Sequence, residues 1–517
     1  MRQTNENAAP PPAGLPTWLT RRVAALVAGP LLGLVGWGLA ATLAPDLPPA
    51  AARVVGLTCW IAAWWVAEPI PIPATSLMPI VLFPLFQIES ARKVATVYAN
   101  HLIILLLAGF LIARSLEIWG LHRRLALTVV SWVGESPRQL VFGFTVAAAF
   151  LSMWISNTAT TLMLIPIALS VVARVGASLT AAQSASFQCC ILLGVAYGAN
   201  VGGTGTLIGT PPNLMFAEYQ PQIDFLRWLA FGVPVVVIFV PLIAWLLTRV
   251  LVPLPGGRSA SERAVVVHEL RALGPLRGPE LRVAVIFAIT AALWIFKGNS
   301  TVPGWCWGLS DRFWDALGAP GSIGVPIAQL ESYFPDAFVG VLMALVLFVT
   351  PAGEAARRPL LVWSDAEAMP WGMLLLFGGG FAIAGAFESS GLSRWLGGVM
   401  SGWLDLPYPL LLVSITTVVV FLTEFTSNTA STAILMPILD GAASAANIAS
   451  IRLMLPAVIA VSFAFMLPVA TAPNAIVFAT GKVPIGRMVA AGFWLNWVGV
   501  GVVFVVILYI APWFGIL

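Results

Sequence analysis

The sequence predicts an all-helical, multi-pass membrane protein. Of its 517 residues, 59% are hydrophobic and only 9% are charged, and the mean hydropathy is +0.93. A chain of this composition has too little polar surface to cover a fold in water. The 46 glycines and 39 prolines indicate close helix contacts and interrupted helices. The apolar segments predict about eleven transmembrane helices and two re-entrant helical hairpins.

Basic residues indicate the topology. Five arginines lie in the longest polar linker, residues 253–282, and Arg21 and Arg22 directly precede the first apolar span at 23–44. Because cytoplasmic loops are enriched in Lys and Arg, we expect the linker and the N-terminus to be cytoplasmic. The predicted organisation is a cytoplasmic tail (1–22), a first half (23–252), the linker, and a second half (283–517). We expect a location in the plasma (inner) membrane and no binding of nucleic acid.

The two halves share a repeated motif. Ser156-Asn157-Thr158 and Ser427-Asn428-Thr429 lie 271 residues apart, and each copy is followed by a proline nine residues after its Asn. The segments around 110–121 and 381–392 match at the same offset. Further along, 209–213 (Gly-Thr-Pro-Pro-Asn) is echoed by 470–474 (Ala-Thr-Ala-Pro-Asn) at an offset of 261. Internal repeats in a hydrophobic chain indicate a transporter.

Each repeat contains one overlong segment and one broken segment. Segments 139–174 and 409–447 would form helices much longer than the ~30 Å hydrocarbon core, so we expect a hairpin in each, with Ser-Asn-Thr at its tip. Segments 186–216 and 452–480 are predicted to be broken at their proline motifs. Unwound backbone at membrane depth is tolerated where it lines a cavity. Two tips and two breaks therefore predict a central binding site.

The charge of these segments indicates the ligand. Lys, Arg and His are absent from 139–173, 175–226, 395–451 and 453–481. A dianion held only by hydroxyls, amides and helix N-termini is poorly compensated at low dielectric, whereas bound cations would neutralise it. Na⁺ prefers oxygen ligands, and the unwound backbone carbonyls and polar side chains of these segments supply them. No His or Cys lies beside the tips, so we expect neither an enzyme nor an organic cofactor.

These motifs, together with the stretch at 65–73 (Trp-Val-Ala-Glu-Pro-Ile-Pro-Ile-Pro), resemble the divalent anion:sodium symporter family over residues 50–514. The resemblance implies two inverted repeats, a homodimer, and a transport domain that moves as an elevator against a scaffold. It also implies coupling to Na⁺ and transport of di- or tricarboxylates or sulfate.

The resemblance assigns residues to two kinds of site. The substrate would contact eight residues, namely Ser156, Asn157, Thr158, Thr210, Ser427, Asn428, Thr429 and Thr471. One sodium ion would lie among Ser152, Ser156, Asn157 and Gly209, and a second among Thr423, Ser427, Asn428 and Ala470.

Several alternatives stay open. The favoured function is sodium-coupled symport of C4 dicarboxylates such as succinate, malate or fumarate. The alternatives are a sodium-independent dicarboxylate exchanger, or a sulfate or citrate transporter of the same fold. A single Ser-Asn-Thr in a membrane helix is more often a helix-packing element than a ligand site, but its duplication favours binding. For the acidic residues near the motifs, Glu68 and Glu424, we expect hydrogen-bonded structural roles rather than ion contacts.

Overall fold

The computed structural model of the protein describes residues 17–515 except 134–135, 176–178, 255–266, 268, 277, 299–303, 311–325, 327–328, 354–356 and 405. Within these ranges the regular structure is helical, apart from one isolated bridge between Pro351 and Pro359. Eight of the described helices are long and apolar enough to span a membrane. The prediction of an all-helical, multi-pass membrane protein is therefore confirmed.

The helices of the first half precede the linker. They are α1 (Thr17–Leu43), α2 (Pro49–Ala67), α3 (Ile72–Thr75), α4 (Met78–Leu85), α5 (Ala91–Val97), α6 (His101–Ile118), α7 (Leu121–Val133), α8 (Pro137–Ser152), α9 (Asn157–Val175), α10 (Ala181–Gly202), α11 (Pro211–Tyr219) and α12 (Phe225–Trp245).

The second half contains α14 (Pro279–Ile295), α16 (Leu330–Tyr333), α17 (Asp336–Val349), α18 (Trp363–Glu367), α19 (Trp371–Ser389), α20 (Leu392–Leu404), α21 (Tyr408–Thr423), α22 (Asn428–Ala445), α23 (Ile451–Ala460), α24 (Ala472–Ala479) and α25 (Ile485–Val505).

Both overlong segments divide at their Ser-Asn-Thr motifs. The first becomes α8 and α9, with a break at 153–156, and the second becomes α21 and α22, with a break at 424–427. In each case the Asn is the first residue of the following helix. The breaks occur where short polar side chains compete with the helix for backbone hydrogen bonds. Each repeat therefore has a polar helix N-terminus in the middle of an apolar segment, where an uninterrupted helix would have none.

Both proline motifs also begin new helices. After α10 the chain makes a short 3₁₀ helix (Gly203–Gly205) and a turn at 207–209 before α11, and after α23 it unwinds over residues 461–471 before α24. Thr210 and Thr471 precede the new helices in extended conformation, with φ of −148° and −143°. Proline at the first positions of a helix removes no needed donor, which explains why the new helices start there.

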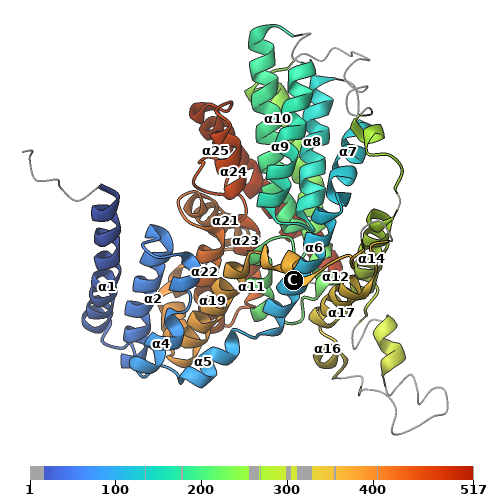
Figure 1. The fold of residues 1–517 in the computed structure, drawn as a ribbon. Coiled ribbons are helices and arrows are strands. Elements are labelled where there is room, and N and C mark those ends of the chain that lie inside the picture. The colour runs from blue at the N-terminus through green and yellow to red at the C-terminus, as the bar shows by residue number, and fades with distance from the viewer. Residues whose placement is uncertain are drawn as a thin grey trace, which may run out of the picture.

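The helices lie around these interruptions (Figure 1). The bundle of α8, α9 and α10 stands together at one end, and α11, α19, α22 and α23 gather near the centre of the view. Helices α1 and α2 pack on one another at one side, whereas α14 and α17 pack near α6 on the other. Short turns with Gly120 (φ +73°) and Gly391 (φ +78°) introduce α7 and α20 at equivalent repeat positions. Non-glycine residues adopt this left-handed conformation with strain.

Part of the linker is anchored to the first half. The Arg124 side chain on α7 donates to both carboxylate oxygens of Glu280, at 2.6 and 2.9 Å, and to the carbonyls of Leu273 and Gly274. Residues 255–266 of the linker, which include Arg258 and Arg263, lie outside the described residues, as does most of the predicted tail. The predicted cytoplasmic placement of both segments stays a prediction.

Candidate functional site

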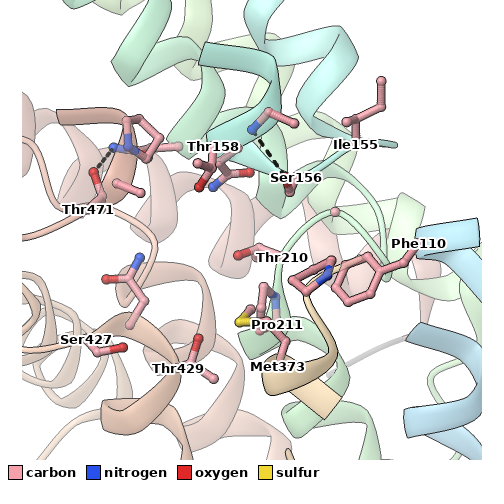
Figure 2. Close-up of a pocket in the computed structure, with 18 of the residues that line it drawn as sticks. Phe110, Ile155, Ser156, Thr158, Thr210, Pro211, Met373, Ser427, Thr429 and Thr471 are labelled. Carbon is pink, nitrogen blue, oxygen red and sulfur yellow. Dashed lines mark hydrogen bonds between the residues drawn. The ribbon is translucent and has the colours of Figure 1, made fainter. Parts of the chain in front are cut away.

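The two tips and the two helix breaks meet at one cavity of about 690 Å³. Figure 2 shows Thr158, Thr210, Ser427, Thr429 and Thr471 around a common space. All eight residues predicted to contact substrate line this cavity, as do Gly209 and Ala470 from the predicted sodium sites. Ser152 and Thr423 are fully buried behind the tips. The structure therefore brings together every residue that the sequence assigned to the site.

Four helix N-termini line the cavity, those of α9, α11, α22 and α24. Unpaired N–H groups and the positive ends of helix dipoles favour an anion at such positions. At the first tip the Ala159 N–H donates to the Ser156 hydroxyl, at 3.2 Å, so Ser156 caps α9. Ser427 makes no equivalent side-chain cap. The arrangement can hold an anion without a fixed cation in the four segments themselves.

The two motif asparagines are held in matching ways. The Ser152 hydroxyl donates to Asn157 Oδ1 at 2.5 Å, and the Thr423 hydroxyl donates to Asn428 Oδ1 at 2.7 Å. Both pairs obey the 271-residue repeat offset. With each Oδ1 turned toward a buried hydroxyl, the Nδ2 group is what each Asn can offer to a carboxylate in the cavity. Each side-chain amide can therefore donate a hydrogen bond toward the cavity, while its oxygen faces a buried hydroxyl on the other side.

Oxygen atoms gather behind each asparagine. At the first tip, a Cβ built on Gly209 would lie 2.5 Å from the Gly203 carbonyl oxygen and 3.1 Å from that of Ser152. At the second tip, the Val461 carbonyl oxygen lies 2.9 Å from the same Thr423 hydroxyl, whose one proton faces both this carbonyl and Asn428 Oδ1. Carbonyl, hydroxyl and amide oxygens are the ligands that hard cations prefer. Both clusters fit the chemistry of a sodium ion.

Each helix break is fixed by a buried asparagine. Asn213 Nδ2 donates to the carbonyls of Gly203 and Thr206, at 2.9 and 2.7 Å. Asn474 Nδ2 donates to the carbonyls of Ala464 and Leu467, at 3.0 and 3.1 Å. The asparagine and its two acceptor residues in the first half each lie 261 residues before their counterparts in the second half. The asparagine of each Pro-Asn pair therefore holds its break open by replacing the lost helical hydrogen bonds.

Glu424 has the hydrogen-bonded role that we expected. Its carboxylate accepts hydrogen bonds from three successive backbone N–H groups, those of residues 465–467, at 2.7 to 3.2 Å. Asn496 Nδ2 donates a further bond at 2.8 Å. The expectation for Glu68 is wrong, because its side chain is exposed on the cavity wall and makes no hydrogen bond in the described structure.

We expect Glu424→Gln to destabilise the protein. The amide would present an N–H₂ group to backbone donors, and a buried donor left unpaired costs about 1–3 kcal/mol. We expect the melting temperature of the purified Glu424→Gln variant to fall while its oligomeric state stays unchanged. Glu68→Gln is the matched control, because the exposed Glu68 side chain has no such partners. Equal melting temperatures for both variants would contradict the structural role of Glu424.

Sequence reasoning missed three features of the cavity wall. Arg114 from α6 lines the cavity and pairs with Glu117, which also lines it, at 2.9 Å. These residues lie outside the segments whose charges were counted. Asn200 on α10 lines the cavity without belonging to any repeated motif. The third feature is an asymmetry of the tips, because Trp154 packs on Phe287 whereas its counterpart Phe425 is 71% exposed. The 271-residue offset alone could have paired Trp154 with Phe425.

Comparisons with known proteins place this site in context. Residues 32–517 match the family model described as the sodium:sulfate symporter transmembrane region. The sodium-dependent dicarboxylate transporter SdcS of Staphylococcus aureus strain MRSA252 is 35% identical over 95% of this chain and 92% of its own length. The same transporter of strain NCTC 8325 is 35% identical over 94% of this chain and 91% of its own length.

Two solved structures share the fold at low sequence identity. The MtrF efflux pump of Neisseria gonorrhoeae superposes with a TM-score of 0.55 and 14% identity, covering 95% of both chains. The YdaH transporter of Alcanivorax borkumensis gives a TM-score of 0.51 and 13% identity, covering 82% of this chain and 87% of its own.

Proposed function

The chain belongs to the sodium:sulfate symporter family of transporters, and we propose that it couples the import of C4 dicarboxylates, such as succinate, malate or fumarate, to sodium. The observation that carries the proposal is the paired arrangement of Asn157 and Asn428. Each presents an amide donor toward the cavity and an oxygen toward a cluster of cation ligands. The name of the S. aureus relatives supports both the substrate and the ion.

The proposed order of events follows from charge. Sodium binds first behind each tip, among Ser152, Asn157 and Gly209 at one and Thr423, Asn428 and Ala470 at the other, with the motif serines nearby. Bound cations orient the asparagines and add positive charge next to four helix N-termini. The dianion then binds between the tips, contacting the two Ser-Asn-Thr motifs, Thr210 and Thr471. A site with unbalanced charge stays in place because moving it through low dielectric is costly.

The same proposal includes an elevator built on two inverted repeats. We assign about eleven transmembrane helices and two re-entrant hairpins, 139–174 and 409–447, to a chain that divides at the linker 253–282. The proposed assembly is a homodimer in the plasma (inner) membrane, with the N-terminus cytoplasmic. The unequal tips support alternating access. Trp154 is packed while Phe425 and Val469 are exposed, at 71% and 79%, so the cavity is open beside the second tip.

An exchanger is the second candidate function, and Arg114 is the observation that favours it. A fixed guanidinium at the cavity wall would partly replace the charge of sodium. However, Arg114 is paired with Glu117 at 2.9 Å, so the pair adds no net charge to the cavity. Sodium remains the better source of compensation for a dianion.

Uptake into proteoliposomes tests the proposal. Purified protein is reconstituted, and succinate uptake is compared under an inward Na⁺ gradient, an equal K⁺ gradient, and with unlabelled succinate inside. We expect uptake driven by Na⁺ without internal succinate. Uptake that ignores Na⁺ and needs internal succinate would establish exchange instead. Citrate and sulfate as competitors report on the remaining alternatives.

The tip threonines should control substrate affinity. Thr158→Val and Thr429→Val keep side-chain shape and remove a hydroxyl that faces the cavity, and a hydrogen bond to a charged group contributes about 1.5–3 kcal/mol. We expect the KM for succinate to rise about tenfold or more, with a smaller change in the sodium dependence. Thr161→Val and Thr432→Val are matched controls, because these hydroxyls donate to the backbone carbonyls one turn earlier in the helix, those of Asn157 and Asn428, and so are not free to bind the substrate. Equal KM changes in all four variants would contradict the assignment.

A further inference from the structure

Asn200 lies at the junction of the two repeats. It is on α10 of the first half, it is 1% exposed, and it lines the cavity. Its Nδ2 group reaches three acceptors of the second half, the Ala464 carbonyl at 3.2 Å, the Thr471 hydroxyl at 3.1 Å and Asn474 Oδ1 at 3.3 Å. The Ala464 carbonyl identifies this group as the amide nitrogen, since an oxygen there would face another acceptor.

Asn200 restricts what the Thr471 hydroxyl can do. A threonine hydroxyl has two acceptor positions and one proton. The Asn474 N–H donates to the Thr471 hydroxyl at 3.3 Å, and Asn200 Nδ2 donates to it at 3.1 Å. Both acceptor positions are then used, so only the proton remains for the cavity. A hydroxyl held in this way can donate to an anion and is a poor ligand for a cation.

The first half lacks this arrangement. The 261-residue offset pairs Asn200 with Val461, which has no amide, and Thr210 forms no side-chain cap like that of Thr471. α10 packs on α24, and in the equivalent arrangement α23 packs on α11. Consistent with an apolar residue at 461, Asn213 Oδ1 is buried without a partner. The fold therefore accepts valine at the equivalent position.

Asn200 also carries an energetic cost. Its Oδ1 atom is buried and has no hydrogen-bond partner. A buried unpaired acceptor is destabilising, and such groups in native structures call for a functional explanation. Removal of the amide would leave the Ala464 carbonyl with its bond from Asn474. It would leave Asn474 Oδ1 unpaired in place of Asn200 Oδ1, the state in which the equivalent Asn213 Oδ1 already lies. The side chain is thus poorly explained as a stabilising element.

We propose that Asn200 is a positioning residue for the transported anion, fixing the Thr471 hydroxyl as an obligatory donor to a substrate carboxylate. The inference rests on the proposed function and adds a residue to its substrate site. It makes the two halves unequal, because Thr471 is a fixed donor whereas no side chain or backbone N–H of the described structure orients the Thr210 hydroxyl in this way. One carboxylate of the substrate is therefore recognised more strictly than the other.

The test uses Asn200→Val in the full-length protein, with Thr471→Val and the double variant. Affinity is measured as the anion-induced rise in melting temperature in Na⁺, using succinate, citrate and sulfate, and as KM for uptake. We expect Asn200→Val to weaken anion binding about tenfold while the melting temperature of the anion-free protein is unchanged or higher. The double variant should bind no more weakly than Thr471→Val alone, because both act through one hydroxyl.

Tyr197→Phe is the matched control. Tyr197 is also on α10, and its hydroxyl donates to the Met488 carbonyl of the second half at 3.4 Å, away from Thr471. The Tyr197→Phe variant should bind the anions with the same affinity as the unmodified protein. Unchanged affinity in Asn200→Val, additive losses in the double variant, or weaker binding that follows a fall in anion-free stability would each overturn the inference. Asn200→Ala provides a second variant judged by the same criteria.

The anion panel separates the two proposals. Failure of succinate to bind the unmodified protein contradicts the proposed function, while the effect of Asn200→Val on citrate or sulfate still decides the role of Asn200. If none of the three anions binds, both proposals fail.

Discussion

Replacing either motif asparagine should reduce coupled transport strongly. Asn157→Ala and Asn428→Ala each remove an amide donor to the anion and an oxygen beside the cation cluster. Bonds to charged groups contribute about 1.5–3 kcal/mol each. Loss of two such bonds corresponds to at least about a hundredfold fall in kcat/KM for succinate. The apparent affinity for Na⁺ should fall with it.

Isosteric aspartate variants separate the two roles. Asn157→Asp and Asn428→Asp keep the oxygen that accepts from Ser152 or Thr423 but replace the donor with a second oxygen. The added negative charge should preserve or increase sodium binding and repel the dianion. Sodium binding is followed as the Na⁺-induced rise in melting temperature, and anion binding as the further rise with succinate. Normal succinate uptake in both alanine variants would contradict the assignment of the tips.

The repeat explains how much of the site the sequence could predict. Matching Ser156-Asn157-Thr158 with Ser427-Asn428-Thr429 located both tips, and the Pro-Asn motifs located both breaks, because polar groups and prolines interrupt helices for local reasons. The partners Ser152 and Thr423 also followed from the family resemblance. These features depend on short stretches of chain, so a single sequence was enough.

Contacts between distant helices were harder to predict. Arg114 lines the cavity because α6 packs against α11 and α19, a tertiary arrangement that a charge count restricted to the repeats could not reveal. Asn200 breaks the repeat, since its counterpart is Val461, and a search for matched motifs passes over it. For Glu68 a hydrogen-bonded structural role was expected because it is an acidic residue near the motifs, yet it lies in a left-handed turn at the end of α2 and lines the open cavity.

Gly209→Ala should weaken the first sodium site, whereas its counterpart Ala470 tolerates substitution. A Cβ at position 209 would meet the Gly203 carbonyl oxygen at 2.5 Å and the Ser152 carbonyl oxygen at 3.1 Å. Both atoms belong to the backbone, so the first approach forces the chain to shift. The displaced oxygens are those of the cluster behind Asn157. Perturbing the surroundings of an ion site typically reduces affinity about 10- to 100-fold, and we expect sodium-driven uptake to fall to the same degree.

Position 470 provides the reciprocal experiment. The second half already has alanine there, and it is 5% exposed, so that break accommodates the methyl group. Ala470→Gly should change the sodium dependence of uptake by less than about twofold, because it removes one methyl group and leaves the cluster oxygens in place. The sodium concentration that gives half-maximal uptake is the measurement for both variants. A similar sodium dependence in the two variants would show that the carbonyls around Gly209 do not hold the ion. A loss of sodium affinity in Gly209→Ala alone would establish that the two oxygen clusters, although built from equivalent residues, differ in the space they leave for a cation.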